Sequence, residues 1–514
     1  MLDAAVAAYL EHVGERAFDE PLIALLRAHG YTDVHLVHGG SEYGKDTIAK
    51  RGGCQFAFQS KAGDINLSGW RGLTGQLDEL RRNRLSHPAF DLSLPRQCVL
   101  VTTGRLNSPA SLAAQDYDGW VREHGEPGLT VWTADRLTEM LLTDPSAALR
   151  ESADASMLAL LADIEDYSVD MDKVEVFSER WLDGPLAELA GIGTLELGLV
   201  ADRLVATNRL DLACHLCLAM VRGAWAANGD RDGAAVTVAD AAAQLFDVYA
   251  LQLRAAVTEV VADRRGLLFG DPPSNWVTYP ARATRTGELL GLLALRQREQ
   301  GDVAADATTK VLAQLVETHP GTAHPISDRY ATCAIPMVLA LSHGHRDHAV
   351  QLVRWMTSWL ADRYDPEALG LAASDATAER ELQYLLGSPF EFIDLRRRQD
   401  SYLAAVLGDL AAVLEDAQLY DDVRNETLAV RVVATLVQAD DRPTQFRRSG
   451  VGVVRVMPAE YTDTLPEDSV PAAHHRRSED GVLLVRLDRS WDLLAVQSVL
   501  RDRHWVAACR SHMA

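Results

Sequence analysis

The chain has 514 residues, of which 47% are hydrophobic, and a formal net charge of −23 at pH 7. This length and hydrophobic content are enough for two or three domains with complete cores. No stretch approaches about 18 uninterrupted apolar residues, and no charged segment leads into an apolar one at the start, so we expect neither a membrane span nor a secretion signal. The six cysteines are scattered, mostly in apolar runs, which is typical of buried thiols in a reducing cytoplasm.

The acidic charge lies mainly in the C-terminal part. Residues 1–150 contain 15 Lys and Arg against 19 Asp and Glu, a balance of −4, which leaves −19 for the remainder. Phosphate binding is driven by Lys and Arg, so the whole-chain charge is unfavourable for a nucleic-acid enzyme while the N-terminal balance is much less so.

The stretch GKDTIAKRGGCQFAFQSK carries the strongest chemical signal. It begins with a loop that contains Asp46 and ends in a strand with alternating residues, so Gln59 and Lys61 share one face and the two phenylalanines the other. Asp46 meets them if the loop folds back over the strand. A carboxylate, a second oxygen donor and a lysine suit Mg²⁺-assisted attack of water on a phosphodiester. Each residue alone is more often a turn or strand-edge residue.

An aspartate followed by a hydrophobic strand that ends in Gln-x-Lys resembles the Mrr-like branch of the PD-(D/E)xK nucleases. The order of elements is also similar over about residues 12–145. The matching segments are a helix over Ala17–Tyr31, a strand over Val34–Val37, a helix from Trp70 to about Arg84, a buried strand over Gln97–Gly104, a helix from Ser108, a strand over Leu129–Thr133 and the closing helix ADRLTEMLL. The resemblance implies an N-terminal α/β restriction-endonuclease-like domain over residues 1–145.

The resemblance also implies roles for individual residues. Asp46 and Gln59, with the main-chain carbonyl of Ser60, would hold Mg²⁺ or Mn²⁺, and Lys61 would orient the attacking water and stabilise the charge that develops. Because Gln59 is neutral where other branches of the superfamily carry glutamate, we expect weaker metal binding.

The family also places an acidic residue on its first helix, where this chain has Asp19 and Glu20. Asp19 shares a helical stripe with Leu22 and Leu26 and so borders the buried face, whereas Glu20 is turned about 100° away. Either would help to bind a second metal ion or water. Pro21 suits the first turn of a helix, so the alternative is that one of them caps it.

Four arginines are candidates for nucleic-acid contacts. Arg81, Arg82 and Arg84 lie on the helix after the motif strand, with Arg71 earlier on the same helix. They would hold a phosphate backbone near Lys61, or form a solvated helix end that the helix dipole favours.

Residues 155–440 are expected to form a large α-helical domain. Nearly every segment from about Met157 to Ala439 reads as an amphipathic helix. Five junctions are similar to the turn of tetratricopeptide-type hairpins at irregular spacing, namely TNRLDLACHL, ANGDRDGAAV, EQGDVAADAT, SHGHRDHAVQ and AQLYDDVRNE. Such an array usually presents a surface to a protein partner. The CxxC pair, Cys214 and Cys217, lies in an amphipathic helix, which favours core packing.

The HGHRDH segment offers a different chemistry. His343, His345, Asp347 and His348 fit the HxHxDH signature of metallo-β-lactamase-fold hydrolases, in which they would bind two zinc ions. The flanking segments, however, read as two helices of a hairpin, and no histidine follows until His474. A polar turn between helices is therefore the preferred interpretation, and a zinc hydrolase is the less favoured alternative.

Residues 441–514 are predicted to form a small α/β region: a strand or hairpin in FRRSGVGVVRVMPAEY, an exposed loop in PEDSVPAAHHRRSEDG, and a strand, GVLLVRLD, before a final helix. No chemistry is assigned to them.

The sequence as a whole predicts a Mg²⁺-dependent endonuclease acting on DNA, with RNA left open. The resemblance implies a restriction or anti-phage role in a bacterial cytoplasm, and such nucleases commonly act as dimers. The acidic remainder favours an enzyme that is regulated or recruited by a protein partner. The alternative is a non-cleaving scaffold with a nuclease-like fold that binds DNA or a protein.

Overall fold

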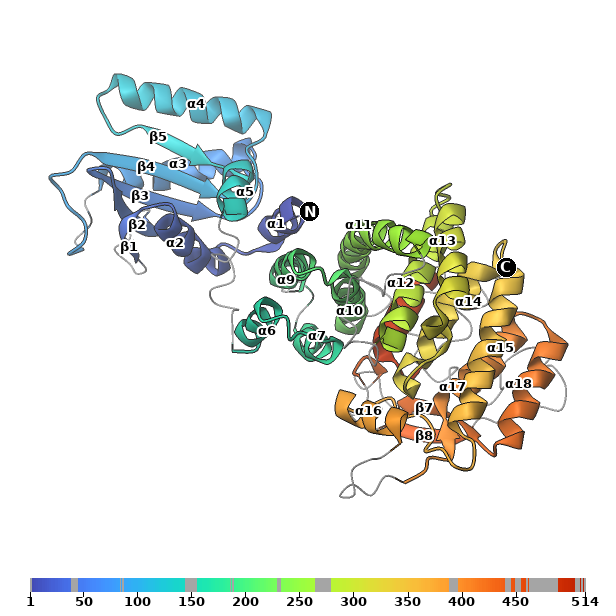
Figure 1. The fold of residues 1–514 in the computed structure, drawn as a ribbon. Coiled ribbons are helices and arrows are strands. Elements are labelled where there is room, and N and C mark those ends of the chain that lie inside the picture. Colours follow the sequence, from blue (N-terminus) through green and yellow to red (C-terminus); the bar gives the residue numbers. More distant parts are fainter. Residues whose placement is uncertain are drawn as a thin grey trace. The chain divides into compact units, whose positions relative to one another are not determined.

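The computed structural model describes residues 2–37, 45–83, 85, 87–143, 155–184, 186, 189–228, 233–263, 279–387, 396–439, 445–448, 454–458, 461, 489–503, 509 and 512. They form two compact units. The first comprises Met1–Ser168 and Gly184–Arg203, and the second comprises Val169–Asp183 and Leu204–Ala514. A mixed α/β region is followed by a largely helical one (Figure 1), which confirms the coarse fold class predicted from the sequence.

The first unit is built on a five-stranded sheet in the order β1-β2-β3-β4-β5. Strand β2 is antiparallel to both β1 and β3, whereas β3, β4 and β5 run parallel. The strands are β1 (Thr32–Leu36), β2 (Thr47–Arg51), β3 (Cys54–Lys61), β4 (Arg96–Thr102) and β5 (Leu129–Trp132). Strand β2 was not predicted, since its residues were taken as part of the loop after Asp46.

Helices cover this sheet on both faces. On one face, Ala57 of β3 and Leu100 of β4 pack with Leu77 of α3 in a single apolar cluster that α4 completes. On the other face, the ring of Tyr31 contacts Phe56 and Phe58. These contacts agree with the alternation predicted for the strand before Lys61. The helical elements of this unit are α1 (Leu2–His12), η1 (Arg16–Phe18), α2 (Asp19–Ala28), α3 (Leu67–Arg82), α4 (Ser108–Glu123), α5 (Ala134–Thr143), α6 (Ala155–Glu165), η4 (Leu189–Gly193) and most of α9 (Thr194–Ala206).

The second unit is mainly helical. Helices α10 and α11 pack against each other, and α12 packs against both α13 and α14. Its elements include α7 (Met171–Ser178), η3 (Glu179–Leu182), α10 (Leu210–Asn228), α11 (Gly233–Asp263), α12 (Tyr279–Glu299), α13 (Ala305–Thr318), η8 (Pro320–Ala323), η9 (Asp328–Cys333), α14 (Ala334–Ser342), α15 (Arg346–Arg363), α16 (Ala378–Leu386), α17 (Tyr402–Val413), α18 (Ala417–Ala429) and α21 (Ser490–Leu500), with a three-stranded sheet of β6 (Asp400–Ser401), β7 (Val433–Ala439) and β8 (Val454–Pro458).

Two local predictions for this unit were wrong. The segment expected to be helical up to Ala439 ends in strand β7, which pairs with β8. Its run of valine and threonine favours a strand because β-branched side chains lose rotamer freedom in a helix. The segment AQLYDDVRNE, read as a junction between helices, lies inside α18. The turn is Glu415–Asp416 instead, where Glu415 has a φ of 51° and Asp416 caps α18.

The described C-terminal residues belong to the second compact unit. Strand β8 is paired with β7, and α21 is buried along its whole length. The indole Nε1 of Trp225 in α10 donates a hydrogen bond to Oδ2 of Asp492 in α21 at 3.0 Å. The predicted loop PEDSVPAAHHRRSEDG and the predicted strand GVLLVRLD lie outside the described residues.

Helix α10 is the one described helix that is long and apolar enough to cross a membrane. Its window Leu210–Ala227 is 89% buried inside the protein. Cys214 and Cys217 lie in this helix and are fully buried. The core-packing interpretation of the CxxC pair is therefore confirmed.

A buried ionic network joins the helices of the second unit. Glu288 of α12 has no exposed surface and accepts hydrogen bonds from Arg285, from Ser498 Oγ at 2.6 Å and from Arg501 Nη1 at 3.2 Å. Cys333 donates a further hydrogen bond from Sγ at 2.9 Å. Burial alone raises the pKa of Glu288, but Arg285 and Arg501 outweigh it and lower the pKa to about 2. Glu288 is therefore ionised when the protein is folded.

This low pKa predicts how stability depends on pH. Between the ordinary value of 4.5 and about 2, the unfolded chain binds a proton at Glu288 and the folded chain does not. The stabilisation is therefore complete above pH 4.5 and is lost as the pH falls through this window, by at most about 1.4 kcal/mol per pH unit. We expect Glu288→Gln to be less stable than wild type by about 3–5 kcal/mol at pH 7. The difference in unfolding free energy, measured by urea denaturation, should shrink below pH 4.5. A constant difference would contradict this assignment.

Candidate active site

The β2–β3 hairpin brings Asp46 beside the end of β3. The two strands are joined by Gly52 and Gly53, whose φ angles of 56° and 76° suit a tight hairpin turn. In the resulting register Thr47 is opposite Phe58, and the backbone N–H of Asp46 donates to the carbonyl oxygen of Phe58 at 2.9 Å. Asp46 thus reaches the predicted strand through antiparallel pairing. The Gly-Gly pair between two alternating segments is the sequence signal that would have predicted β2.

The carboxylate of Asp46 contacts two of the predicted ligand residues. Its Oδ2 accepts hydrogen bonds from Gln59 Nε2 and from the Ser60 backbone N–H, each at 2.6 Å. The other amide atom, Gln59 Oε1, is buried and has no hydrogen-bond partner among the described residues. The N–H and C=O of one residue in a strand point to the same side, so the Ser60 carbonyl also faces Asp46. The side-chain amide of Gln59 and the backbone of Ser60 therefore both lie beside the Asp46 carboxylate.

These groups fit a hard divalent cation. A carboxylate, an amide carbonyl and a main-chain carbonyl are the oxygen ligands that Mg²⁺ and Mn²⁺ accept. The buried Gln59 Oε1 is an acceptor that lacks a donor, which a cation would satisfy. Among the described residues, no group of three or more His, Cys, Asp or Glu side chains is arranged for a metal ion. Any cation at this site must therefore be held partly by amide and backbone oxygens.

Lys61 forms an ion pair with a residue that the sequence analysis did not select. Its Nζ lies 2.8 Å from Oε1 of Glu15, and the two side chains are 21% and 44% exposed. Glu15 directly precedes the short helix η1. No spacing rule links it to Lys61, 46 residues later, so only the folded chain shows the pair.

The structure places the two predicted helix carboxylates differently. Asp19 is buried and is the first residue of α2, whereas Glu20 beside it is exposed. The N-cap position is occupied by Phe18, with no side-chain capping hydrogen bond. Neither acid is therefore the cap that the sequence analysis considered. Both lie in the first turn, where a carboxylate interacts favourably with the helix dipole.

Arg81 is an internal structural residue. Its side chain is 2% exposed and forms ion pairs with Asp78 at 2.7 Å and with Glu126 at 2.8 Å. Its guanidinium also lies over the rings of Tyr117 and Trp120, 5.3 Å and 5.7 Å from their centroids. The buried guanidinium of Arg81 is therefore engaged with partly exposed acids on its own unit, and its contact with nucleic acid stays a prediction.

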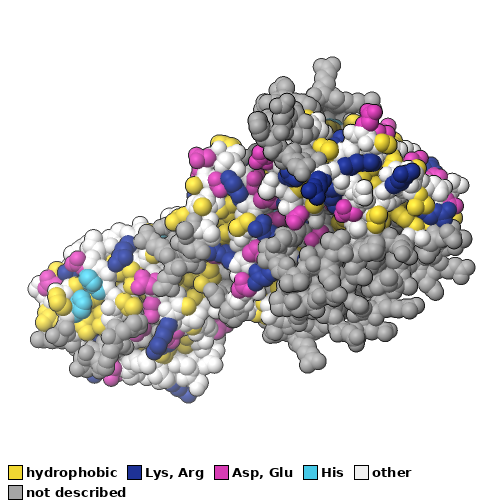
Figure 2. All heavy atoms as spheres, turned by 90° about the horizontal axis from the view of Figure 1, so that it is seen from below, with side chains coloured by type: hydrophobic (Ala, Val, Ile, Leu, Met, Phe, Trp, Pro, Cys, Tyr) yellow, Lys and Arg dark blue, Asp and Glu magenta, His cyan; other side chains and the backbone are white. Residues whose placement is uncertain are grey.

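The other predicted arginines differ in exposure. Arg71 is exposed on α3. The side chain of Arg82 is 52% exposed and lies 3.5 Å from Glu126. Arg84 lies outside the described residues. On the face of the described residues shown in Figure 2, positive and negative side chains are interspersed, so a phosphate backbone would meet single cations there rather than a continuous basic surface.

The HGHRDH segment comprises the turn of residues 343–345 between α14 and α15 and the first three residues of α15. Gly344 has a φ of 96°, and the ring nitrogen Nε2 of His343 lies 2.7 Å from the carbonyl oxygen of His512. This hydrogen bond occupies one predicted zinc ligand. Among the described residues, no group of three or more His, Cys, Asp or Glu side chains is arranged to hold a zinc ion. A polar turn therefore remains the preferred interpretation of this segment.

At the end of the five-stranded sheet, the backbone of Gly104 lies very close to the backbone of Gly63 and Asp64. A Cβ on Gly104 would lie 2.2 Å from the carbonyl carbon of Gly63 and 2.4 Å from the nitrogen of Asp64. Thr102 Oγ1 donates to the Gly63 carbonyl oxygen at 2.6 Å, which holds the two segments together. The chain that leaves β3 after Lys61 is thereby fixed against the end of β4.

Gly104→Ala should therefore disturb the site from a distance. Both colliding atoms are main-chain atoms, so the backbone has to shift. We expect a loss of about 1–3 kcal/mol in the unfolding free energy of the first unit and faster amide hydrogen exchange in β3 and β4. Gly72→Ala is the control, because a Cβ at this exposed position in α3 would meet no atom within 4 Å; it should be neutral or stabilise by up to about 1 kcal/mol. Equal exchange rates in the two variants would contradict the close approach.

Comparisons with known protein families, with curated proteins and with solved structures find no match for this chain. The resemblance to the Mrr-like nucleases therefore depends on the residues and the order of elements described above. The functional inference depends on the geometry of Asp46, Gln59, Ser60 and Lys61.

Proposed function

We propose that this chain is a metal-dependent endonuclease that cleaves DNA, with a restriction-endonuclease-like first unit. The observation that carries the proposal is the convergence of Gln59 Nε2 and the Ser60 N–H on Asp46 Oδ2, each at 2.6 Å, directly before Lys61 in the same strand. The mixed sheet with parallel β3, β4 and β5 supports it. The resemblance further suggests bacterial restriction or anti-phage defence in the cytoplasm, with action as a dimer.

Each residue has a defined task in this proposal. Asp46, Gln59 and the Ser60 carbonyl would hold Mg²⁺ or Mn²⁺, which when bound would polarise the phosphodiester and activate water. Lys61 would orient the attacking water and offset the negative charge that develops on the phosphate. Glu15 is a positioning residue, since its carboxylate holds the ammonium group 2.8 Å away.

A non-cleaving scaffold is the second candidate, and the same site offers one observation in its favour. Asp46 Oδ2 already accepts two hydrogen bonds, which would also suit a carboxylate that only fastens β2 to β3. In that case the helical unit would carry the main interaction, with a protein partner. The two candidates differ in whether a cation is bound and whether DNA is cut.

The test is cleavage of supercoiled plasmid and linear DNA in Mg²⁺, Mn²⁺ or EDTA. We expect wild type to cut with either metal ion and not in EDTA, and Lys61→Ala and Asp46→Asn to lose about 10²-fold or more in rate. Glu15→Gln should retain metal binding but cut more slowly. Lys50→Ala is the matched control: Lys50 forms a similar ion pair with Asp33 at 2.8 Å in the same sheet, with 25% exposure, and its loss should leave cleavage unchanged.

Two outcomes would overturn parts of this proposal. Cleavage that survives Lys61→Ala would refute the site assignment. A wild-type protein that binds Mn²⁺ in calorimetry or binds DNA in a mobility-shift assay, yet cuts neither substrate, would favour the scaffold.

A further inference from the structure

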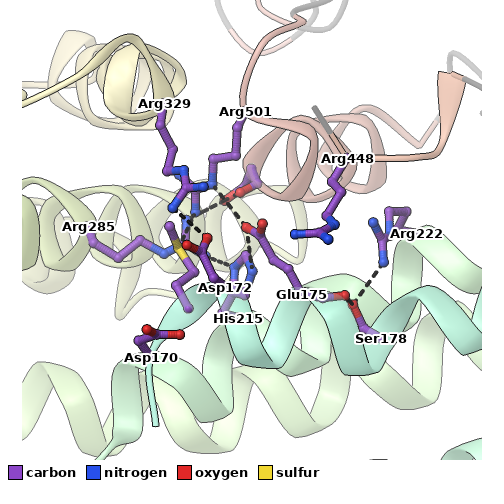
Figure 3. Close-up of polar contacts among 12 residues, drawn as sticks. Asp170, Asp172, Glu175, Ser178, His215, Arg222, Arg285, Arg329, Arg448 and Arg501 are labelled. Atoms are coloured by element: carbon purple, nitrogen blue, oxygen red, sulfur yellow. Dashed lines mark hydrogen bonds and ion pairs between the residues drawn. The ribbon is translucent and has the colours of Figure 1, made fainter. Parts of the chain in front are cut away.

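A polar cavity of about 130 Å³ lies inside the second unit. Side chains from α7, from η9 and from the C-terminal segments meet around it (Figure 3). Its wall is completed by residues 374–377, which lead into α16. The charged residues that line it are three arginines and three acids, namely Arg329, Arg448, Arg501, Asp172, Glu175 and Asp375.

Three arginines direct guanidinium groups at this cavity. Arg329 is paired with Asp172, with Nη1 and Oδ1 2.6 Å apart, and Arg501 is held by Glu288 through Nη1 at 3.2 Å. The guanidinium of Arg448 forms no ion pair with any described residue. Each guanidinium has five N–H donors in a fixed plane. Arg329 and Arg501 therefore have further N–H groups besides those used in these pairs, and Arg448 has N–H groups unused by any described residue as well.

Several buried polar atoms at the cavity lack partners. Nε of Arg448 and Nε of Arg501 are buried and donate to no described acceptor. Oε1 of Glu175, a residue only 3% exposed, receives no hydrogen bond from a described donor. Nε2 of His215 lies 3.3 Å and Nε of Arg501 lies 3.9 Å from this oxygen. Because buried polar groups are normally paired, the cavity needs a molecule that supplies both acceptors and a donor.

The cavity presents hydrogen-bond donors from three arginines beside acceptors from the carboxylates. Burial, followed by the charges of Arg285 and Arg501, lowers the pKa of His215 well below its ordinary value, so this ring beneath the cavity is neutral. Helix α16 begins after the N-cap Thr377 at the cavity wall. The N-terminal end of a helix carries partial positive charge and unpaired backbone N–H groups, which bind oxyanions.

We propose that this cavity binds the free hydrogen phosphate ion, a small oxyanion that keeps a hydrogen-bond donor of its own at neutral pH. The guanidinium groups of Arg448, Arg501 and Arg329 would bind the anionic oxygens, as arginine does at phosphate sites. The carboxylates of Glu175 and Asp172 would accept the remaining O–H.

The size of the cavity limits the ligand. A protein cavity of about 150 Å³ holds one benzene molecule, so a cavity of about 130 Å³ has room for a phosphate and a few further atoms. A nucleic-acid strand does not fit inside it. This site is therefore separate from the proposed DNA-cleaving chemistry and does not depend on it.

The carboxylates of Glu175 and Asp172 should make the site selective for hydrogen phosphate over sulfate. Sulfate has nearly the same size and shape as phosphate but has no proton to donate at neutral pH. If sulfate entered, Glu175 would face its oxygens with no hydrogen bond between them, and a site built around a hydrogen bond rejects a ligand that lacks the group. Hydrogen phosphate should therefore bind and sulfate should not.

The test is isothermal titration calorimetry of the full chain with inorganic phosphate and with sodium sulfate, in a buffer free of both. We expect one saturable phosphate site and at least 10-fold weaker binding of sulfate. Arg448→Ala should weaken phosphate binding at least 10-fold. Arg447→Ala is the matched control, because the neighbouring Arg447 pairs with Glu179 and Asp183 and does not line the cavity; its phosphate affinity should equal that of wild type.

Further experiments test whether the site recognises the O–H group of the ligand. Glu175→Gln, whose amide can donate to an anion, should narrow the difference between phosphate and sulfate. Methyl phosphate has a second pKa of about 6 and is therefore mostly a dianion without an O–H group at neutral pH, so it should bind at least 10-fold more weakly than inorganic phosphate, and equal binding would overturn the proposal. No saturable phosphate binding by wild type, equal binding of sulfate, or unchanged binding by Arg448→Ala would each overturn the proposal. None of these readouts involves DNA cleavage, so the two proposals fail independently.

Discussion

A single buried carboxylate, that of Glu288, is bound by side chains from three separate parts of the second unit. Arg285 lies one turn away on α12, Cys333 ends η9, and Ser498 and Arg501 come from the end of α21. A carboxylate without exposed surface is tolerated only where it is paired and hydrogen-bonded. The requirement that these groups meet therefore fixes where three distant segments of the chain must lie.

The phosphate cavity follows from this arrangement. Arg501 is held through Nη1 by Glu288 and through Nη2 by Met171, so the orientation of its guanidinium group beside the cavity is set whether or not a ligand is there. The same holds for Arg329 and Asp172. Preorganised donors reduce the conformational entropy that a ligand has to offset on binding. The first unit uses the same principle at its proposed metal site, where backbone pairing of β2 with β3 sets the distance between Asp46 and Gln59.

Much of the first unit could be predicted because its elements have strong local signals. The strand before Lys61 alternates, and the helix that begins after Asn107 has a capping residue and a proline in its first turn. Strand β2 was missed because a glycine pair was read as part of a loop. The ion pairs of Glu15 and Arg81 could not be predicted, since a helix pattern shows which residues are polar but not which distant residue each of them contacts. Glu126, which pairs with Arg81, lies 45 residues further along the chain.

The buried position of α21 has a consequence for how the protein is made. Trp225 and its hydrogen-bond partner Asp492 are 267 residues apart in the chain. At roughly 5–20 residues per second, a ribosome needs about 13–53 s to cover that distance. Throughout this time α10 is in the cell without α21, which packs against it in the folded protein, and its apolar surface remains open to other chains. The second unit must therefore complete its core after synthesis has passed α21, so a chaperone that covers α10 during translation would raise the yield of folded protein.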